Sequence, residues 1–164
     1  MDQKPSLPEY RKSGNTAELY SEIPIRATPA RIWAILTDFP RYPEWNPFIR
    51  TIEGPCIEGA GITADLRPPG GFGMTINPVI RTVVPERELR WIGHLFVRGL
   101  FDGEHVFEIL KRDGESCLFV QHEFFFGLLL PLLENSLKNG TTRGFDEMNR
   151  ALKARAEQET GIVP

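Results

Sequence analysis

After Pro47 the chain alternates short apolar runs with turn residues, and this texture constrains the fold more than any other feature of the sequence. The runs end at turn-forming pairs such as Gly54-Pro55 and Asp113-Gly114. Runs of this length, joined by tight turns, are typical of antiparallel strands. The pattern predicts a meander of six strands, preceded by a seventh at 19–26. The six runs cover residues 48–53, 61–67, 74–84, 88–95, 101–110 and 116–126.

The last part of the chain has helical rather than strand periodicity. From Pro131 to about Glu157, one stripe of apolar or small residues recurs at intervals of three and four positions, which predicts a long amphipathic helix. Two short helices are also expected between the first and second strands, the first beginning at Thr28-Pro29 with threonine as its cap. The stripe consists of Leu133, Leu137, Thr141, Gly144, Met148 and Leu152.

These elements predict an α+β fold in which a curved seven-stranded antiparallel sheet wraps around the C-terminal helix. The sheet has one face to cover, and the long helix carries the only apolar stripe large enough to cover it. We expect a flexible leader over 1–17, one domain over 18–158 and a short tail over 159–164, because a chain of 164 residues fits one domain.

Composition excludes several classes of protein. Hydrophobic residues make up 41% of the chain and the formal net charge is −3, so nucleic acid is a poor candidate partner. The longest apolar run, Phe124–Leu133, is shorter than the roughly 20 residues that a membrane span needs. Without a secretory signal or paired cysteines, we expect a cytoplasmic protein with no stable membrane insertion, as a monomer or a homodimer.

The sequence contains no motif for a cofactor or a metal. Gly70-Gly71-Phe72-Gly73 lacks the GxGxxG spacing and follows two prolines, so it resembles a flexible rim more than a phosphate site. The three histidines lie on separate strands without HxH or HExxH spacing. We therefore expect no cofactor and no metal site.

The middle of the long helix suggests an internal cavity. Gly140, Thr141 and Gly144 stand where a filled core would favour larger side chains, although a mid-helix glycine costs about 0.5–1 kcal/mol relative to alanine. Small residues here leave either a hollow between helix and sheet or a close contact between their backbones. Eleven phenylalanines and three tryptophans would suit a ligand that is flat or contains rings.

Alternate residues of the strands give candidate walls for this cavity. On strand 88–95, Leu89 and Trp91 share a face, as do His105 and Phe107 on strand 101–110. On strand 116–126 both faces carry large apolar groups, so the inward face stays open. The candidate ligand-binding residues are Trp33, Leu89, Trp91, His105, Phe107, Leu137, Thr141, Gly144 and Met148.

His105 is the candidate catalytic residue. On neighbouring antiparallel strands it could meet His94 or one of Gln121-His122-Glu123. A histidine beside a carboxylate in an apolar hollow could move a proton during a condensation or dehydration. The alternative is a polar pair with a structural role, which is the commoner case.

The segments Thr28–Phe39 and Trp45–Phe48 resemble a signature of the START-like (SRPBCC, polyketide cyclase/dehydrase-like) superfamily. Gly99–Phe107 and Gln121–Leu129 add to a resemblance that spans roughly 19–157. It implies the helix-grip fold, which agrees with the predicted element order. Trp33 lies in this signature, where a structural role is the alternative to ligand binding.

The resemblance does not specify one function, because the superfamily includes lipid carriers, binders of hormones and alkaloids, aromatase/cyclases and a dehydrogenase accessory subunit. Our first hypothesis is a binder of a hydrophobic small molecule (lipid, aromatic or polyketide-like). The second is an aromatase/cyclase or dehydratase that acts on a polyketide-like substrate. A third is an accessory protein that binds another protein or a membrane surface.

Overall fold

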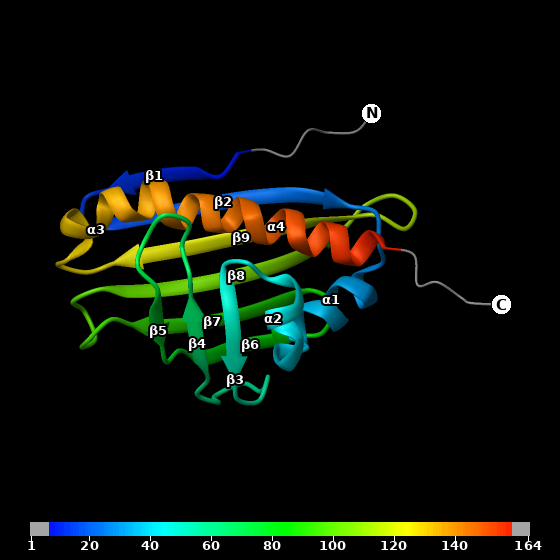
Figure 1. Ribbon diagram of the computed structural model, residues 1–164, viewed down its shortest axis with the longest axis horizontal. Coiled ribbons are helices and arrows are strands. Elements are labelled where there is room, and N and C mark those ends of the chain that lie inside the picture. Colours follow the sequence, from blue (N-terminus) through cyan, green and yellow to red (C-terminus); the bar gives the residue numbers. More distant parts are fainter. Residues whose placement is uncertain (1–6, 159–164) are drawn as a thin grey trace.

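The computed structural model describes residues 7–158 and shows two antiparallel sheets with a C-terminal helix (Figure 1). The larger sheet has the strand order β1-β2-β9-β8-β7-β6 and the smaller has the order β3-β4-β5. The larger sheet consists of β1 (Glu9–Ser13), β2 (Thr16–Ile25), β6 (Val79–Val84), β7 (Glu88–His94), β8 (Asp102–Lys111) and β9 (Cys117–Phe126). The smaller sheet consists of β3 (Ile49–Glu53), β4 (Thr63–Leu66) and β5 (Met74–Ile76).

The helices and the smaller sheet cover one face of the larger sheet (Figure 1). The C-terminal helix lies over β2 and β9, whereas β3–β5 lie over β6 and β7. This arrangement confirms the predicted α+β helix-grip fold. The helices are α1 (Pro29–Thr37), the single turn η1 (Phe39–Arg41), α2 (Tyr42–Trp45), α3 (Leu130–Ser136), the π-helical turn η2 (Leu137–Thr141) and α4 (Thr142–Glu157).

The described residues form nine strands instead of the predicted seven, and one of the two additional strands arises because run 74–84 forms two strands rather than one. Asn77 and Pro78 separate β5 from β6, and each strand belongs to a different sheet. Proline lacks the N–H that a continuous ladder would use, so the chain changes sheet at this point. The predicted single curved sheet is therefore two sheets that lie face to face.

The predicted leader over 1–17 is corrected at Glu9–Ser13, which forms β1 and pairs with β2 from Glu9↔Tyr20 to Ser13↔Thr16. The strand is mostly exposed and polar, so it lacks the apolar alternation that signals a strand. Gly14, with a φ of 59°, provides the tight turn between the two strands. Residues 1–6 and the predicted tail at 159–164 lie outside the described residues.

Local polar contacts confirm the predicted cap of the first helix and fix the turn that follows the helical segment. The hydroxyl of Thr28 accepts a hydrogen bond from the Arg31 backbone N–H at 3.3 Å and caps α1. The side-chain oxygen of Asn46 accepts from the backbone N–H groups of Phe48 and Ile49, at 3.0 and 2.9 Å. Asn46 thereby fixes the turn that sends β3 under the C-terminal helix.

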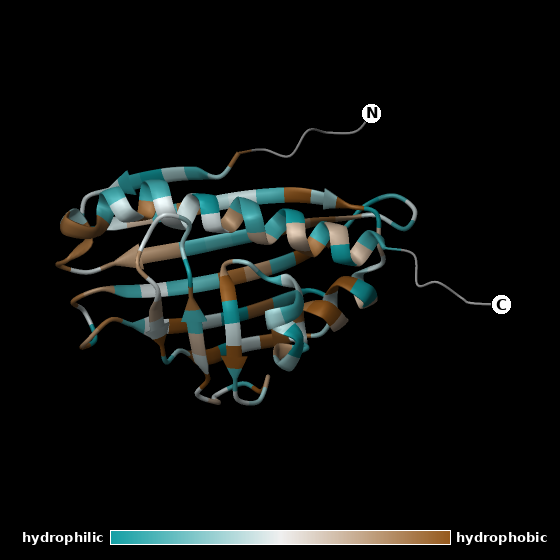
Figure 2. Cartoon of the chain, in the orientation of Figure 1, coloured by the Kyte–Doolittle hydropathy of each residue, from teal (hydrophilic) through white to brown (hydrophobic). Residues whose placement is uncertain are grey.

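The long C-terminal helix is continuous but contains the π turn η2 between α3 and α4. Its outer side, like β1, is mostly hydrophilic (Figure 2). On its inner side Gly144 lies against the ring of Phe48, the residue before β3, because a Cβ at this position would lie under 3.0 Å from that ring. The Phe48 and Phe145 rings pack with their centroids 5.9 Å apart. At Gly144, therefore, the small residue permits close contact and does not leave a hollow.

Candidate functional site

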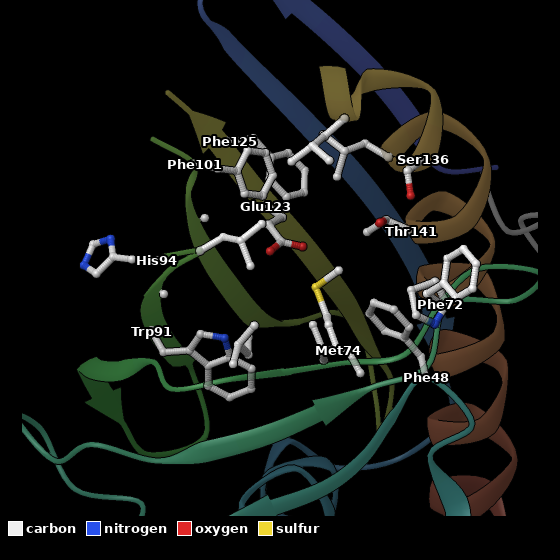
Figure 3. A pocket seen from close by; sticks show the side chains of 18 residues that line it. Phe48, Phe72, Met74, Trp91, His94, Phe101, Glu123, Phe125, Ser136 and Thr141 are labelled. Atoms are coloured by element: carbon white, nitrogen blue, oxygen red, sulfur yellow. The ribbon is translucent and has the colours of Figure 1, made fainter. Parts of the chain in front are cut away.

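A cavity lies between the α3–η2 part of the helix, the smaller sheet and the larger sheet (Figure 3). Its volume is about 110 Å³, and it is partly open to solvent beside Phe72, whose side chain is 96% exposed. An apolar cavity of roughly 150 Å³ accommodates a benzene-sized molecule, so the closed part holds about one ring. Most of the wall is apolar: Phe48, Leu66, Pro68, Phe72, Met74, Ile76, Trp91, Gly93, Leu95, Phe101, Gly103, Phe125, Leu133 and Leu137.

Three of the predicted ligand-binding residues line this cavity. Trp91 comes from β7 in the larger sheet, and Leu137 and Thr141 come from η2. The π turn brings Leu137 and Thr141, four positions apart, to the same wall. Thr141 and the nearby Ser136 add two hydroxyl groups to a mostly apolar lining.

The structure places the other predicted wall residues outside this cavity. Leu89 on β7, Phe107 on β8 and Met148 on α4 are fully buried members of the hydrophobic core. Gly144 is covered by Phe48. Trp33 is half-buried on α1 and packs against the core. The cavity lies at the other end of the helix, so a ligand-binding role for these five residues stays a prediction.

His105 also lies in the core, beneath the cavity floor. Its ring stacks on Phe107 and Phe145, with centroids 4.1 and 5.0 Å away. Its Nε2 lies 3.0 Å from the Gln121 side-chain oxygen. Burial lowers the pKa of His105 to about 3, although the hydrogen bond with Gln121 opposes this shift. The imidazole is therefore neutral and held by packing.

Glu123 is a candidate functional residue of this cavity. From the sequence it is expected only as a possible neighbour of His105. It is paired directly with His105 across β8 and β9, and its carboxyl group points into the cavity (Figure 3). The side chain is 16% exposed, and burial raises its pKa to about 8. At neutral pH most of these carboxyl groups therefore carry a proton.

The inward face of β9, which the sequence left open, contains Gln121, Glu123 and Phe125. Gln121 reaches α4, where its side-chain N–H donates to Asn149, and the other two line the cavity. Two polar residues at alternate positions of an apolar strand were the available signal. Their position directly opposite His105 follows only from the register of the sheet.

His94 lies at the edge of the cavity, but its ring points away from the hollow (Figure 3). Its Nδ1 lies 2.6 Å from a carboxylate oxygen of Asp102. The same carboxylate accepts hydrogen bonds from the Gly99 backbone N–H at 3.0 and 3.1 Å. The His94–Asp102 pair thus fixes the β7–β8 loop, and Glu123 is the titratable side chain that points inward.

In the part of the chain that the structure describes, no three His, Cys, Asp or Glu side chains are grouped as a metal site would require. Within residues 7–158 no helix is both long and apolar enough to cross a membrane.

Together, the wrapped helix and the apolar cavity define a helix-grip protein with an internal pocket. The sequence profile of the family described as "Polyketide cyclase / dehydrase and lipid transport" matches residues 16–157. The chain belongs to this family, which confirms the resemblance in its sequence. No curated protein sequence matches the chain.

Solved structures with the same fold are distant in sequence. A norcoclaurine synthase point mutant from Thalictrum flavum, in complex with a transition-state analogue, is 14% identical with a TM-score of 0.69; the match covers 89% of this chain and 97% of that one. A START superfamily protein from Mycobacterium smegmatis is 17% identical with a TM-score of 0.66, covering 86% and 97%.

The di-domain ARO/CYC StfQ of the steffimycin biosynthetic pathway gives a TM-score of 0.72 at 14% identity. The match covers 90% of this chain but 53% of StfQ, so this chain spans about half of that protein. At such identities the likeness concerns the fold alone.

Proposed function

We propose that the protein binds a hydrophobic small molecule in the cavity between the α3–η2 segment and the two sheets. The observation that carries the proposal is an apolar hollow, open beside Phe72, at one end of an otherwise closely packed interior. Pockets with mostly apolar linings and a few polar groups are the usual sites for such ligands. Family membership supports the same role, because the family description includes lipid transport.

The size of the cavity limits the part of the ligand that is enclosed. About 110 Å³ holds roughly one ring, so a larger molecule would extend toward the exposed side chain of Phe72 or displace it. Trp91, Phe101 and Phe125 present aromatic surface to this ring.

Filling the cavity tests the proposal. In Thr141→Phe a ring from η2 would occupy the hollow, so binding of para-fluoroethylbenzene should weaken at least tenfold, as measured by fluorine NMR. The control is Thr51→Phe, the same substitution at an exposed position of β3, which should leave binding unchanged. Equal binding by wild type and Thr141→Phe would contradict the proposal.

A second candidate function is an aromatase/cyclase or dehydratase, and one observation favours it. Glu123 presents a carboxyl group of raised pKa inside an apolar pocket, which is the environment of a general acid. An acid–base step in this cavity would involve Glu123, because the His105 ring is enclosed by Phe107 and Phe145. If Glu123→Gln loses turnover of a polyketide-like substrate but retains affinity for the ligand, the enzymatic function is supported. If the wild-type protein shows no turnover, the binding function stands without catalysis.

A further inference from the structure

The carboxyl group of Glu123 lacks a hydrogen-bond partner within residues 7–158. The imidazole of His105, its partner across the sheet, places Nδ1 3.9 Å from Oε2, which is beyond hydrogen-bond distance. Across the sheet stands Gly103, where a Cβ would lie 3.1 Å from Glu123 Oε1. Gly103 thus leaves room for the carboxyl group without offering it a side-chain partner.

A buried hydrogen-bond network determines which nitrogen of the His105 imidazole carries the proton, and so which atom faces Glu123. Gln121 donates to Asn149 through its amide N–H, and Asn149 donates to Ser21. The Gln121 oxygen is left to accept, so His105 donates to it from Nε2. The Nδ1 that faces Glu123 is therefore unprotonated, and His105 offers no positive charge to a carboxylate.

The other elements around Glu123 provide no counter-charge either. The cavity wall that the structure describes contains no lysine or arginine. His94 on β7 is directed away and bonded to Asp102, and the helix contributes only the hydroxyl groups of Ser136 and Thr141. An ionised carboxylate would be uncompensated here, which agrees with the raised pKa of Glu123.

We infer that the ligand carries an uncharged hydrogen-bond acceptor, such as a ketone or ester carbonyl, and that the Glu123 carboxyl donates a hydrogen bond to it. This inference rests on the proposed binding function and specifies the chemistry of its ligand. A protonated carboxyl has one O–H to donate. The acceptor that faces it, His105 Nδ1, lies beyond hydrogen-bond distance at 3.9 Å, so a ligand carbonyl supplies an acceptor within reach. A ligand carboxylate is disfavoured because its charge would be desolvated in a wall without cations.

Four single-ring probes test this inference by fluorine NMR: para-fluoroacetophenone, para-fluoroethylbenzene, para-fluorobenzoate and para-fluorobenzylamine. They share a ring and differ in the group that would meet Glu123. At pH 6 we expect the ketone to bind about fivefold more tightly than the ethyl compound, the worth of one neutral hydrogen bond. This preference should fall as the pH rises through 8, because the ionised carboxylate no longer donates.

Two variants separate hydrogen bonding from titration. Glu123→Met removes the donor and keeps an apolar side chain of similar length, so the ketone preference should disappear while para-fluoroethylbenzene still binds. Glu123→Gln retains an N–H donor but does not titrate, so the preference should persist and become independent of pH. The control is Glu53→Met, at an exposed position of β3, which should behave as wild type.

The outcomes distinguish this inference from the proposed function. If none of the four probes binds, both fail. If the ketone and the ethyl compound bind equally, or Glu123→Met keeps the ketone preference, the binding function stands and the inference is overturned. Tightest binding of the benzylamine or the benzoate would also overturn it, because the site would then recognise a charged group.

Discussion

The two ends of the C-terminal helix cover the same sheet in opposite ways. Under α4 the interior is solid, with Phe107, Phe145 and Met148 fully buried. Under α3 and η2 the interior contains a hollow into which Glu123 projects. The space between a long helix and the curved sheet around it thus need not be hollow along the whole helix. The difference arises where the chain enters the smaller sheet. Phe48, just before β3, covers Gly144 and also forms part of the cavity wall, and residues of β4 and β5 line the cavity beyond it.

The largest expected effect separates the packed end from the hollow end. Phe107→Ala should lower the free energy of unfolding by about 3–5 kcal/mol, because it leaves a void in a closely packed core. Met74→Ala, in the cavity wall and 40% exposed, should cost less than about 1 kcal/mol. Urea unfolding of both variants measures the contrast, and equal losses would contradict the division into packed and hollow ends.

A smaller effect on stability tests whether the glycines of the helix are needed for close contact with neighbouring side chains. Gly144→Ala should destabilise the protein by about 1–3 kcal/mol despite the better helix propensity of alanine, because its Cβ would overlap the Phe48 ring. At Gly140 a Cβ would lie 3.2 Å from Pro68 Cβ, a tight contact that a small shift of Pro68 would relieve. The better helix propensity of alanine offsets this cost, so Gly140→Ala should be nearly neutral. In a Phe48→Leu background the cost of Gly144→Ala should shrink; an unchanged cost would show that the ring contact is not its cause.

The smallest of the three effects depends on pH and concerns Glu123. The ordinary carboxyl pKa is 4.5, and folding raises it to about 8, so the unfolded state releases the proton first. Stability should therefore decline from about pH 5 to pH 8 and level off above pH 8. In Glu123→Gln this decline should be reduced by about 1.4 kcal/mol, the equivalent of one pKa unit, or more. Parallel pH profiles of unfolding for wild type and variant would refute the raised pKa.

The fold was largely predictable because its signals are local. The Thr28-Pro29 helix start and the apolar runs act over a few residues, and all but run 74–84 form the predicted element. The split at Pro78 was also visible in the sequence, although its consequence, a change of sheet, depends on tertiary packing. The polar strand β1 offered no apolar pattern, so it was assigned to the leader.

The site was predictable only in part because it depends on register and on long-range filling. Trp91, Leu137 and Thr141 lie in the cavity wall, since period-two and helical patterns identify inward faces. No pattern shows that Phe48, far away in the chain, fills the space beside Gly144. Likewise, the opposition of Glu123 to His105 requires the pairing of β8 with β9.

The π turn at Leu137–Thr141 inserts one residue into the helical repeat, and this has a consequence for any shortened form of the chain. Deleting a single residue there would convert the turn to an ordinary α-helical one, because a π turn uses about one more residue than an α-helical turn for the same full rotation. The segments α3 and α4 would then keep nearly the same faces toward the sheets. A deletion within α3 has no such turn to absorb it, and the residues before it would rotate by roughly 100° about the helix axis. The π turn is thus the place where this helix tolerates a change of length without turning away the side chains that roof the hollow.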